Sequence, residues 1–262
     1  MMYKVFFKNS KGLKLCGIWH LPKTKTDKAI ILAHGLNVDK DELGIFIYLA
    51  NTLQENGYSV FRFDFRAHGE SEGNSIDLRV AGEIEDLESA INYVKNEGYS
   101  KFGLLGASFG GPVAVLYSSN HQEDIKCLCL WNPTLNFDHA LLNPILPKFK
   151  SRKKVWDKDL KEKGWTTTGR NELKIGIGLF EEVKNLFPHD ELKKIKIPTA
   201  IVHGTNDVYV PYADSKEYVK YLKNGELITI ENLGHGFQEK NPEDYKTNKP
   251  IIKTVEFFTK NL

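Results

Sequence analysis

The stretch "GLLGASFGG", residues 103–111, places Ser108 between two glycines directly after a run of apolar residues. The residues before it, "KFGLL" at 101–105, are typical of a buried strand, and "FGGPVAVLYSS" at 109–119 has helical spacing. A serine on such a strand–turn–helix bend projects its hydroxyl above the sheet, and glycines on both sides let neighbouring backbone pass close by. We therefore interpret Ser108 as a nucleophile; a plain turn serine is the alternative.

Short strand-like runs alternate with longer amphipathic runs from about residue 28 onward. The near-continuous apolar character of the short runs is typical of parallel strands that are covered on both faces. The alternation predicts an α/β fold with a doubly wound, mostly parallel sheet, preceded by an antiparallel hairpin. The hairpin is expected at 3–8 and 13–22, and the later strands at 28–35, 58–66, 101–107, 125–131, 199–204 and 226–234.

Three of the amphipathic runs are predicted to be helices, at 41–57, 83–98 and 214–225. Each run ends in a glycine, a residue that often follows the last turn of a helix. The expected terminating residues are Gly57, Gly98 and Gly225. In the second run the apolar residues share one helical face, formed by Ile84, Leu87, Ile91 and Val94.

One long segment interrupts the alternation. About sixty residues separate "WNP" at 131–133 from "IKIPTAIVHG" at 195–204, and they contain no obvious buried strand. A long excursion between two core strands is more typical of an inserted lid than of a disordered loop. We therefore predict a core domain formed by 1–134 and 191–262, with an inserted lid at 135–190 between the sixth and seventh strands.

Within this lid the sequence predicts a hairpin turning at 169–171 and a short helix at 178–187. Residues 148–163 hold eight Lys or Arg against three acids, a local balance of +5. This charge favours a solvated face, with an acidic substrate or a phospholipid surface as alternatives. Seven large apolar residues of the lid are available to line a pocket: Phe137, Leu141, Leu142, Trp156, Trp165, Leu179 and Phe180.

The composition, 41% hydrophobic and 27% charged, indicates a globular protein with a sizeable core. The net charge of +2 gives no support for nucleic-acid binding. No apolar run approaches the roughly 20 residues needed to span a bilayer, so we expect no stable membrane insertion. The N-terminal residues do not resemble a signal peptide. Cys127 and Cys129 are expected in a buried strand, and three cysteines favour a reducing cytoplasm over a disulfide framework.

A serine nucleophile needs a base within hydrogen-bond reach. In a strand–turn–helix site the expected chain order is serine, then an acid, then histidine, each after a later strand. Asp207 follows one predicted strand and His235 follows the next, so both are expected at the carboxyl edge of the sheet. Asp190 and Asp214 are rival acids, although Asp214 fits better as a charge at a helix N-terminus. His203 is expected to shape the loop rather than act as base.

Attack by the serine creates an oxyanion, which needs preorganised hydrogen-bond donors. The backbone amide of Phe109, the residue after the serine, is one expected donor. The amide of Leu36, in the loop that follows the strand at 28–35, is the other. His34 and Gly35 are expected to shape that loop.

Five motifs carry a family resemblance: "HGLN" at 34–37, "FRFDFRAHGESEG" at 61–73, "GASFGG" at 106–111, "HGTNDVYVP" at 203–211 and "GHGF" at 234–237. From about residue 12 to 260 the chain resembles the α/β-hydrolase superfamily. The closest resemblance is to its small bacterial serine esterases, which include cinnamoyl/feruloyl esterases and monoacylglycerol-lipase-like enzymes. The resemblance implies an eight-stranded sheet. It also implies roles as nucleophile, base, orienting acid and oxyanion donors for Ser108, His235, Asp207, Leu36 and Phe109.

The stretch at 61–73 has one departure from the family pattern. Asp64, Arg66, His68 and Gly69 match a family stretch that looks structural, so direct chemistry by His68 is not expected. Ala67 stands where relatives commonly have glycine. The departure lies outside the proposed catalytic residues, and its expected consequence is a small shift of this loop.

The sequence therefore predicts a serine carboxylesterase that acts on small-molecule esters through an acyl-enzyme, with hydroxycinnamoyl or short-chain acyl esters as candidate substrates. No metal or organic cofactor is required for this chemistry. The alternatives within the enzymes are a monoacylglycerol lipase, a thioesterase and a proline-directed aminopeptidase. A ligand-binding receptor on a hydrolase fold is the alternative from another class. The sequence leaves a homodimer open.

Overall fold

The computed structural model describes residues 1–168, 173–238 and 241–262. Its centre is an eight-stranded sheet in the order β1-β2-β4-β3-β5-β6-β9-β10. The strands are β1 (Met2–Lys8), β2 (Lys14–His20), β3 (Lys28–Ala33), β4 (Ser59–Phe63), β5 (Lys101–Ala107), β6 (Ile125–Trp131), β9 (Thr199–Gly204) and β10 (Gly225–Ile230). β2 pairs antiparallel with both β1 and β4, and all other pairs are parallel. The predicted mostly parallel sheet and opening hairpin are confirmed.

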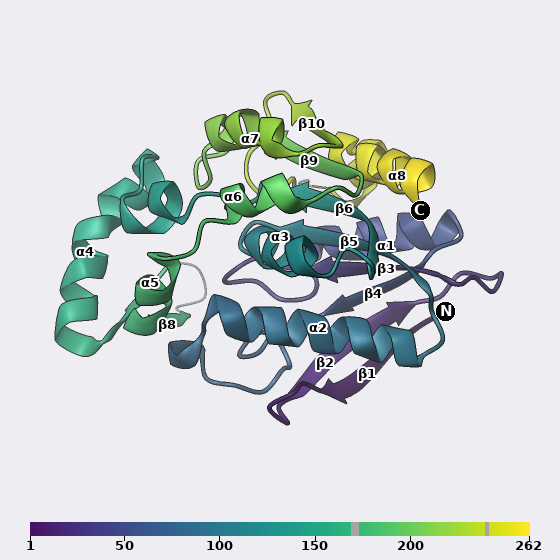
Figure 1. The fold of residues 1–262 in the computed structure, drawn as a ribbon, viewed down its shortest axis with the longest axis horizontal. Coiled ribbons are helices and arrows are strands. Elements are labelled where there is room, and N and C mark those ends of the chain that lie inside the picture. The colour runs from purple at the N-terminus through teal and green to yellow at the C-terminus, as the bar shows by residue number, and fades with distance from the viewer. Residues whose placement is uncertain (169–172, 239–240) are drawn as a thin grey trace.

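Helices cover both faces of the sheet (Figure 1). They are α1 (Ile45–Glu55), α2 (Val80–Asn96), α3 (Gly110–Asn120), α7 (Tyr212–Tyr218) and α8 (Lys249–Asn261). On β3, Ile31 belongs to the core cluster that contains α2 and α3, whereas Ile30 and Leu32 belong to the cluster that contains α1 and α8. Both faces are thus buried, which explains why the strands are apolar almost throughout. No helix in the described ranges is long and apolar enough to cross a membrane.

The predicted helix ends are correct at two of three glycines. Gly57 and Gly98 follow α1 and α2 with φ of 90° and 93°, a conformation that favours glycine. The prediction for Gly225 is wrong, because this residue opens β10. The helix ends earlier, since buried Leu222 is already extended, with φ of −74° and ψ of 132°. Helix α8 was not predicted, although Asn248 caps it by accepting a hydrogen bond from the Ile251 amide.

Most of the segment between β6 and β9 lies at one end of the sheet, whereas its last helix, α6 (Pro188–Glu191), lies beside α3 (Figure 1). The segment also contains α4 (Pro147–Lys163), β7 (Trp165–Thr167), β8 (Lys174–Gly176) and α5 (Ile177–Val183). β7 and β8 pair antiparallel where a hairpin was predicted, and α5 lies where a short helix was predicted. The predicted turn at 169–171 lies outside the described residues. The basic residues form α4, a helix that the sequence analysis did not assign.

Hydrogen bonds within this segment and from it to the core help to hold it in place. Buried Trp156 of α4 donates its Nε1–H to the carbonyl of Thr167 over 3.1 Å. The carboxylate of Glu182 in α5 accepts hydrogen bonds from the amides of Val80 and Ala81, at 2.6 and 3.0 Å. These amides open α2 and have no partner inside that helix, so the segment caps a helix of the core.

Candidate active site

Ser108 lies on the turn between β5 and α3 with a φ of 51°, in the left-handed region that residues other than glycine rarely adopt. Its neighbours allow this tight turn. A Cβ on Gly106 would lie 2.5 Å from the carbonyl oxygen of Gly110, and a Cβ on Gly110 would lie 2.4 Å from that of His34. Both positions therefore need glycine. The strand–turn–helix bend predicted around Ser108 is present.

The imidazole of His235 lies between Ser108 and Asp207. Its Nε2 is 3.0 Å from Ser108 Oγ, and its Nδ1 is 2.6 Å from Asp207 Oδ2. The three residues follow the carboxyl ends of β5, β9 and β10, which meet at one edge because these strands are parallel. The structure thus brings together the three residues selected from the sequence as nucleophile, base and acid.

The carboxylate of Asp207 is buried and makes contacts through both oxygens. Oδ1 accepts hydrogen bonds from the amides of Tyr209 and Val210, at 2.8 and 2.9 Å. Burial opposes ionisation, yet the electrostatic interaction with the imidazole of His235 and the hydrogen-bonding contacts with His235 and His203 hold the pKa of Asp207 below its usual range. The carboxylate is therefore available as an anion to orient His235 and to stabilise its protonated form.

His203 lies at the buried end of β9, directly behind this carboxylate. Its Nε2 is 3.3 Å from Asp207 Oδ2, an ion-pair distance without the alignment of a hydrogen bond, and its Nδ1 is 2.7 Å from Ser215 Oγ. The rival acids make other pairs. Asp214 is 2.9 Å from Nδ1 of His139, and exposed Asp190 pairs with a neighbouring lysine.

The two predicted oxyanion donors, Leu36 and Phe109, both line the cavity beside Ser108. Phe109 immediately precedes α3, so its amide belongs to the group of helix N-terminal amides that lack an intrahelical partner. Gly35 allows the loop of Leu36 to approach, because a Cβ there would lie 2.9 Å from Ser108 Cβ. Glu42 was missed by sequence reasoning. Its buried carboxylate accepts a hydrogen bond from the Gly35 amide over 2.8 Å and so holds this loop.

The stretch after β4 forms a buried polar support. Asp64 accepts hydrogen bonds from the amide and the ammonium of Lys40, at 2.7 and 3.0 Å. Gly69 passes so close that a Cβ would lie 2.4 Å from the Asp64 carboxylate. Arg66 pairs with Asp86 through Nε and Nη2, at 2.9 and 2.8 Å. These side chains hydrogen-bond to one another and do not line the cavity at Ser108, which agrees with the structural role expected for this stretch.

His68 belongs to the same support. It is buried, its Nδ1 is 2.9 Å from the carbonyl of Arg66, and its ring centre is 5.0 Å from that of His34. Burial and the neighbouring His34 lower the pKa of His68 to about 4. Ala67, the departure from the family pattern, adopts a φ of 61°. The loop thus keeps the left-handed turn for which glycine is better suited.

A cavity of about 350 Å³ opens above Ser108 and His235. Of the seven apolar lid residues considered from the sequence, Leu141 lines it. The other six are not among its described lining residues; the ring of Phe137, for example, packs 5.7 Å from that of Phe109. Residues that sequence reasoning did not place in the wall include Val38, Lys148, Phe149, Arg152, Thr168, Tyr209 and Gln238. Helical spacing of 148, 149 and 152 would have grouped three of them on one face of α4.

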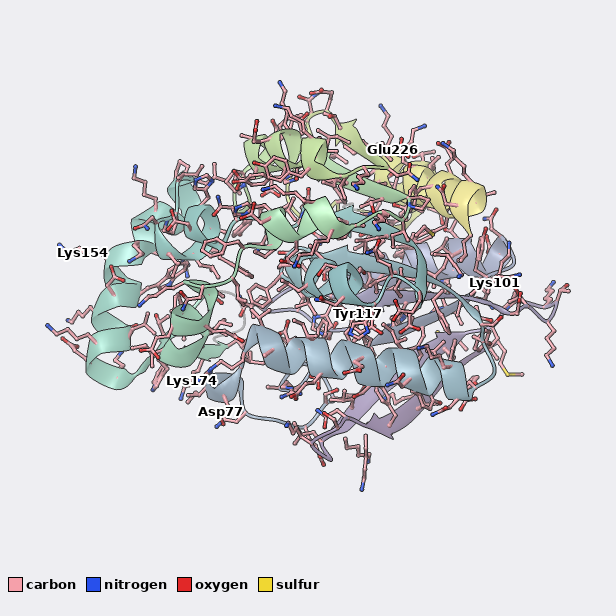
Figure 2. The ribbon with its side chains drawn as sticks, in the orientation of Figure 1. Asp77, Lys101, Tyr117, Lys154, Lys174 and Glu226 are labelled. Carbon is pink, nitrogen blue, oxygen red and sulfur yellow. The ribbon has the colours of Figure 1, made fainter. Side chains whose placement is uncertain are left out.

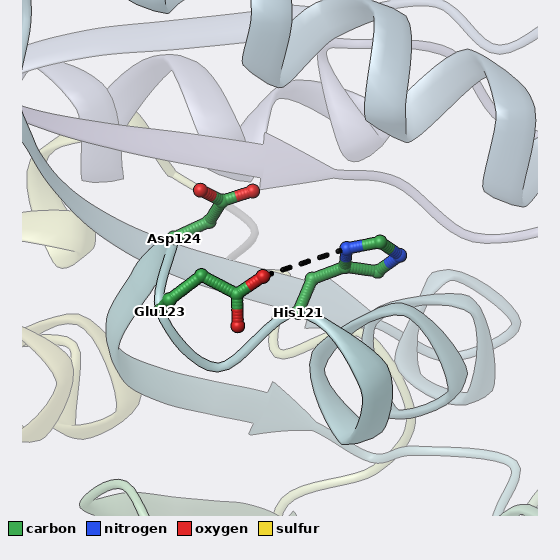
Figure 3. Close-up of side chains that lie close together, drawn as sticks. All are labelled: His121, Glu123 and Asp124. Atoms are coloured by element: carbon green, nitrogen blue, oxygen red, sulfur yellow. Dashed lines mark ion pairs between the residues drawn. The ribbon is translucent and has the colours of Figure 1, made fainter.

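A second cluster of polar side chains lies at the opposite end of α3. His121, Glu123 and Asp124 lie close together, with 3.9 Å between His121 Nδ1 and a Glu123 carboxylate oxygen (Figure 3). Both oxygens of Asp124 have partners already, the Lys95 ammonium at 2.6 Å and the Tyr117 hydroxyl at 3.0 Å. The cluster is half open to solvent and separate from the Ser108 cavity.

Known proteins are similar to this chain in sequence or in fold. Mouse monoacylglycerol lipase ABHD6 is 23% identical over 86% of this chain and 74% of its own length. Putative esterase/lipase 2 of Mycoplasma pneumoniae is 26% identical over 78% of this chain and 81% of its own. The structure of Est1E from Butyrivibrio proteoclasticus with ferulic acid bound has a TM-score of 0.75 at 20% identity, over 96% of this chain and 99% of that one. At this identity the structural likeness shows the fold alone.

A family model described as serine aminopeptidase, S33, matches residues 24–241. The match includes every strand from β3 to β10. It also includes Ser108, Asp207 and His235, which contact one another at the edge of the sheet. With the eight-stranded sheet, it confirms the resemblance to α/β hydrolases of the esterase and lipase type. The chain therefore belongs to the serine aminopeptidase S33 family of α/β hydrolases.

Proposed function

We propose that this protein is a serine carboxylesterase that cleaves carboxylic esters through an acyl-enzyme. The observation that carries the proposal is the continuous line of contacts from Asp207 through His235 to Ser108, at 2.6 and 3.0 Å. An isolated serine hydroxyl is a weak nucleophile, and a histidine oriented by a carboxylate is the usual means of activating it.

In the proposed cycle Ser108 Oγ attacks the ester carbonyl carbon while Nε2 of His235 takes the hydroxyl proton. Asp207 keeps the imidazole oriented and stabilises its charge. The same proton then goes to the departing alcohol, which leaves Ser108 acylated. Water, deprotonated by His235, attacks the acyl carbon and releases the acid. Because His235 carries every proton, the proposed cycle requires neither a metal nor an organic cofactor.

We assign the oxyanion hole to the amides of Leu36 and Phe109. Their support is their position in the cavity wall on either side of Ser108, together with the glycine that lets the Leu36 loop approach. Two amides aimed at one oxygen stabilise the tetrahedral intermediate, and loss of one donor typically costs about 2.7–4 kcal/mol of barrier.

We also propose that residues 135–190 act as the lid and that 1–134 and 191–262 form the core domain. Leu141, Lys148 and Arg152 of this segment line the cavity, which supports a role in substrate choice. The cavity of about 350 Å³ suits an ester with a short or a single aromatic acyl group. Short-chain acyl and hydroxycinnamoyl esters are therefore the first candidate substrates. The corresponding thioesters should be tested beside them.

The family description raises an aminopeptidase as the second candidate. Such an enzyme needs acidic groups that hold the substrate ammonium. Glu42 is the one carboxylate among the described lining residues, and it accepts a hydrogen bond from the Gly35 amide. Lys148 and Arg152 would repel an ammonium. These charges favour the esterase over the aminopeptidase.

The test compares wild type with Ser108→Ala on p-nitrophenyl esters of increasing acyl length, a methyl hydroxycinnamate and an aminoacyl p-nitroanilide. Ser118→Ala, a buried serine on the helix that follows the bend, is the matched control. We expect ester turnover in wild type and Ser118→Ala and its loss in Ser108→Ala. Hydrolysis of the anilide alone would favour the aminopeptidase, and no turnover by folded wild type would favour a receptor.

We further propose a cytoplasmic location. Its support is the state of the cysteines: Cys16, Cys127 and Cys129 are all unpaired and buried. Unpaired thiols are typical of proteins in a reducing compartment. The test is to alkylate the denatured protein from cell extracts and to measure its mass. If all three thiols are reduced, the protein should carry three alkyl groups.

A further inference from the structure

Two cations of α4, Lys148 and Arg152, line the same cavity as Ser108 and His235. They are four residues apart, so they lie on the same face of the helix, one turn from each other. Lys148 Nζ is 5.8 Å from the ring centre of Tyr209, and this ring is 5.4 Å from that of His235. The cations are therefore part of the wall that a bound substrate would touch.

These two charges have no acidic counterpart among the described residues, although Lys148 lies near the ring of Tyr209. In the described part of the chain, neither side chain forms an ion pair with a carboxylate. Two other cations of the same helix do: Lys153 pairs with Asp157, and Lys163 pairs with Asp159 at 2.7 Å. Lys154 extends away from the body of the molecule into solvent (Figure 2). The basic segment thus separates into a solvated face and a pair that faces the cavity.

The described part of the cavity wall carries a net positive charge. Its described lining residues include two cations, Lys148 and Arg152, and one carboxylate, Glu42. Glu42 is buried and accepts a hydrogen bond from the Gly35 amide, so it belongs to the support of the loop. The guanidinium of Arg152 is half-buried and has five N–H donors in a fixed, planar arrangement. This geometry is well suited to bind a carboxylate or a phosphate.

We propose that the substrate is an ester that carries a second, negatively charged group, a carboxylate or a phosphate, which Arg152 and Lys148 bind while Ser108 attacks the ester carbonyl. This inference rests on the proposed esterase function and adds the class of substrate. The anionic group selects the substrate and positions the ester, and it takes no part in the bond changes at Ser108.

Matched substrate pairs test this and also separate the two anions. For the carboxylate, mono(4-nitrophenyl) adipate is compared with its methyl ester, and release of nitrophenolate is followed for both. For the phosphate, 1-butanoylglycerol 3-phosphate is compared with 1-butanoylglycerol, and release of butanoate is followed. We expect wild type to prefer at least one anionic member by about tenfold or more in kcat/KM. The preferred pair identifies the anion.

The variants are Arg152→Gln and Lys148→Gln, with Lys154→Gln as the control from the solvated face of the same helix. Each of the first two should lower kcat/KM for the anionic member by about tenfold and leave that for the neutral member nearly unchanged. Lys154→Gln should change neither. The preference should also weaken as salt is raised, because both cations are partly exposed.

Two different failures are distinguishable in this experiment. If wild type hydrolyses the neutral esters but shows no anionic preference in either pair, the inference is wrong and the esterase stands. Equal losses in Lys154→Gln and Arg152→Gln would also overturn it, because general surface charge would then explain the preference. If no ester of any charge is hydrolysed by folded wild type, the proposed function itself fails.

Discussion

His235 Nε2 lies 3.0 Å from Ser108 Oγ although 127 residues separate the two in the sequence. The approach depends on the order of the sheet, in which β5, β6, β9 and β10 are neighbours and parallel. The loops after these strands therefore open on one edge. The pairing joins the turn after β5 to the loop after β10 across two intervening strands.

The charge of Asp207 should matter more for turnover than for folding. Asp207→Asn keeps the size of the side chain but removes the charge that stabilises protonated His235. We expect kcat for an ester to fall by about 10³- to 10⁴-fold, as in other enzymes with this arrangement. Steady-state kinetics with 4-nitrophenyl butanoate measures this. Asp190→Asn, which changes an exposed acid, should keep the wild-type rate, and equal rates in both variants would remove Asp207 from the mechanism.

Gly35→Ala should impair the oxyanion hole. The added Cβ would lie 2.9 Å from Ser108 Cβ, so the Leu36 loop must move away. We expect kcat to fall roughly 10²-fold or more, the effect of losing one donor. Gly98→Ala is the control: its Cβ meets open space, but its φ is +93°. That variant should lose about 1 kcal/mol of stability at an unchanged rate. Full activity in Gly35→Ala would contradict the assigned hole.

Ala67→Gly should stabilise the protein. Ala67 has a φ of 61°, which costs a residue with a Cβ about 1–2 kcal/mol, while the added freedom of glycine in the unfolded chain offsets about 0.4–1 kcal/mol. We expect a net gain of about 0.5–1 kcal/mol in the free energy of unfolding, measured in urea. Ala81→Gly, on the exposed side of α2, should have the opposite sign. A loss of stability in Ala67→Gly would show that the methyl group packs favourably.

Stability should fall as the pH is lowered from about 6.5 to about 4. Burial lowers the pKa of His34 and of His68 to about 4, whereas the unfolded chain keeps values near 6.5. Between these limits the unfolded state binds protons that the folded state does not, so stability present above pH 6.5 is lost on acidification. The loss is on the order of a few kcal/mol for the pair.

Urea unfolding at pH 7 and pH 4.5 measures this loss. Removal of one histidine should reduce it, so His68→Asn should lose less stability than wild type between the two pH values. His121→Asn is the control, because the side chain of His121 is 41% exposed, whereas that of His68 is buried. Equal losses in wild type and His68→Asn would show that other groups cause the acid sensitivity.

The sheet and the positions of Ser108, Asp207 and His235 were predictable because each depends on a short, local sequence pattern. Buried parallel strands read as apolar runs, and the Ser108 bend needs glycine at Gly106 and Gly110 for steric reasons. Asp207 and His235 could be selected because they follow strands that end at the same edge. These features depend on a few residues each, so a single sequence contains them.

The cavity wall was harder to predict, because it depends on where a surface helix docks. The sequence offered seven apolar lid residues as available to line the cavity, but it did not show which of them do so. Trp156 is buried between Phe149 and Phe180, and Phe137 packs on Phe109. Two cations of α4, Lys148 and Arg152, line the cavity together with Leu141. The support from Glu42 was also hidden, because its φ of 45° and its contact with the Gly35 amide arise from the path of the loop.

The central claim, that Ser108 is acylated during ester cleavage, is tested most directly by covalent labelling. Wild type, Ser108→Ala and Ser118→Ala are treated with diethyl 4-nitrophenyl phosphate, which phosphorylates an activated serine and releases nitrophenolate. Intact mass and peptide mapping then locate the label. We predict one diethylphosphoryl group on Ser108 in wild type and Ser118→Ala, with parallel loss of esterase activity, and none in Ser108→Ala. Ester hydrolysis by wild type without a label on Ser108, or by Ser108→Ala at the wild-type rate, would contradict the account.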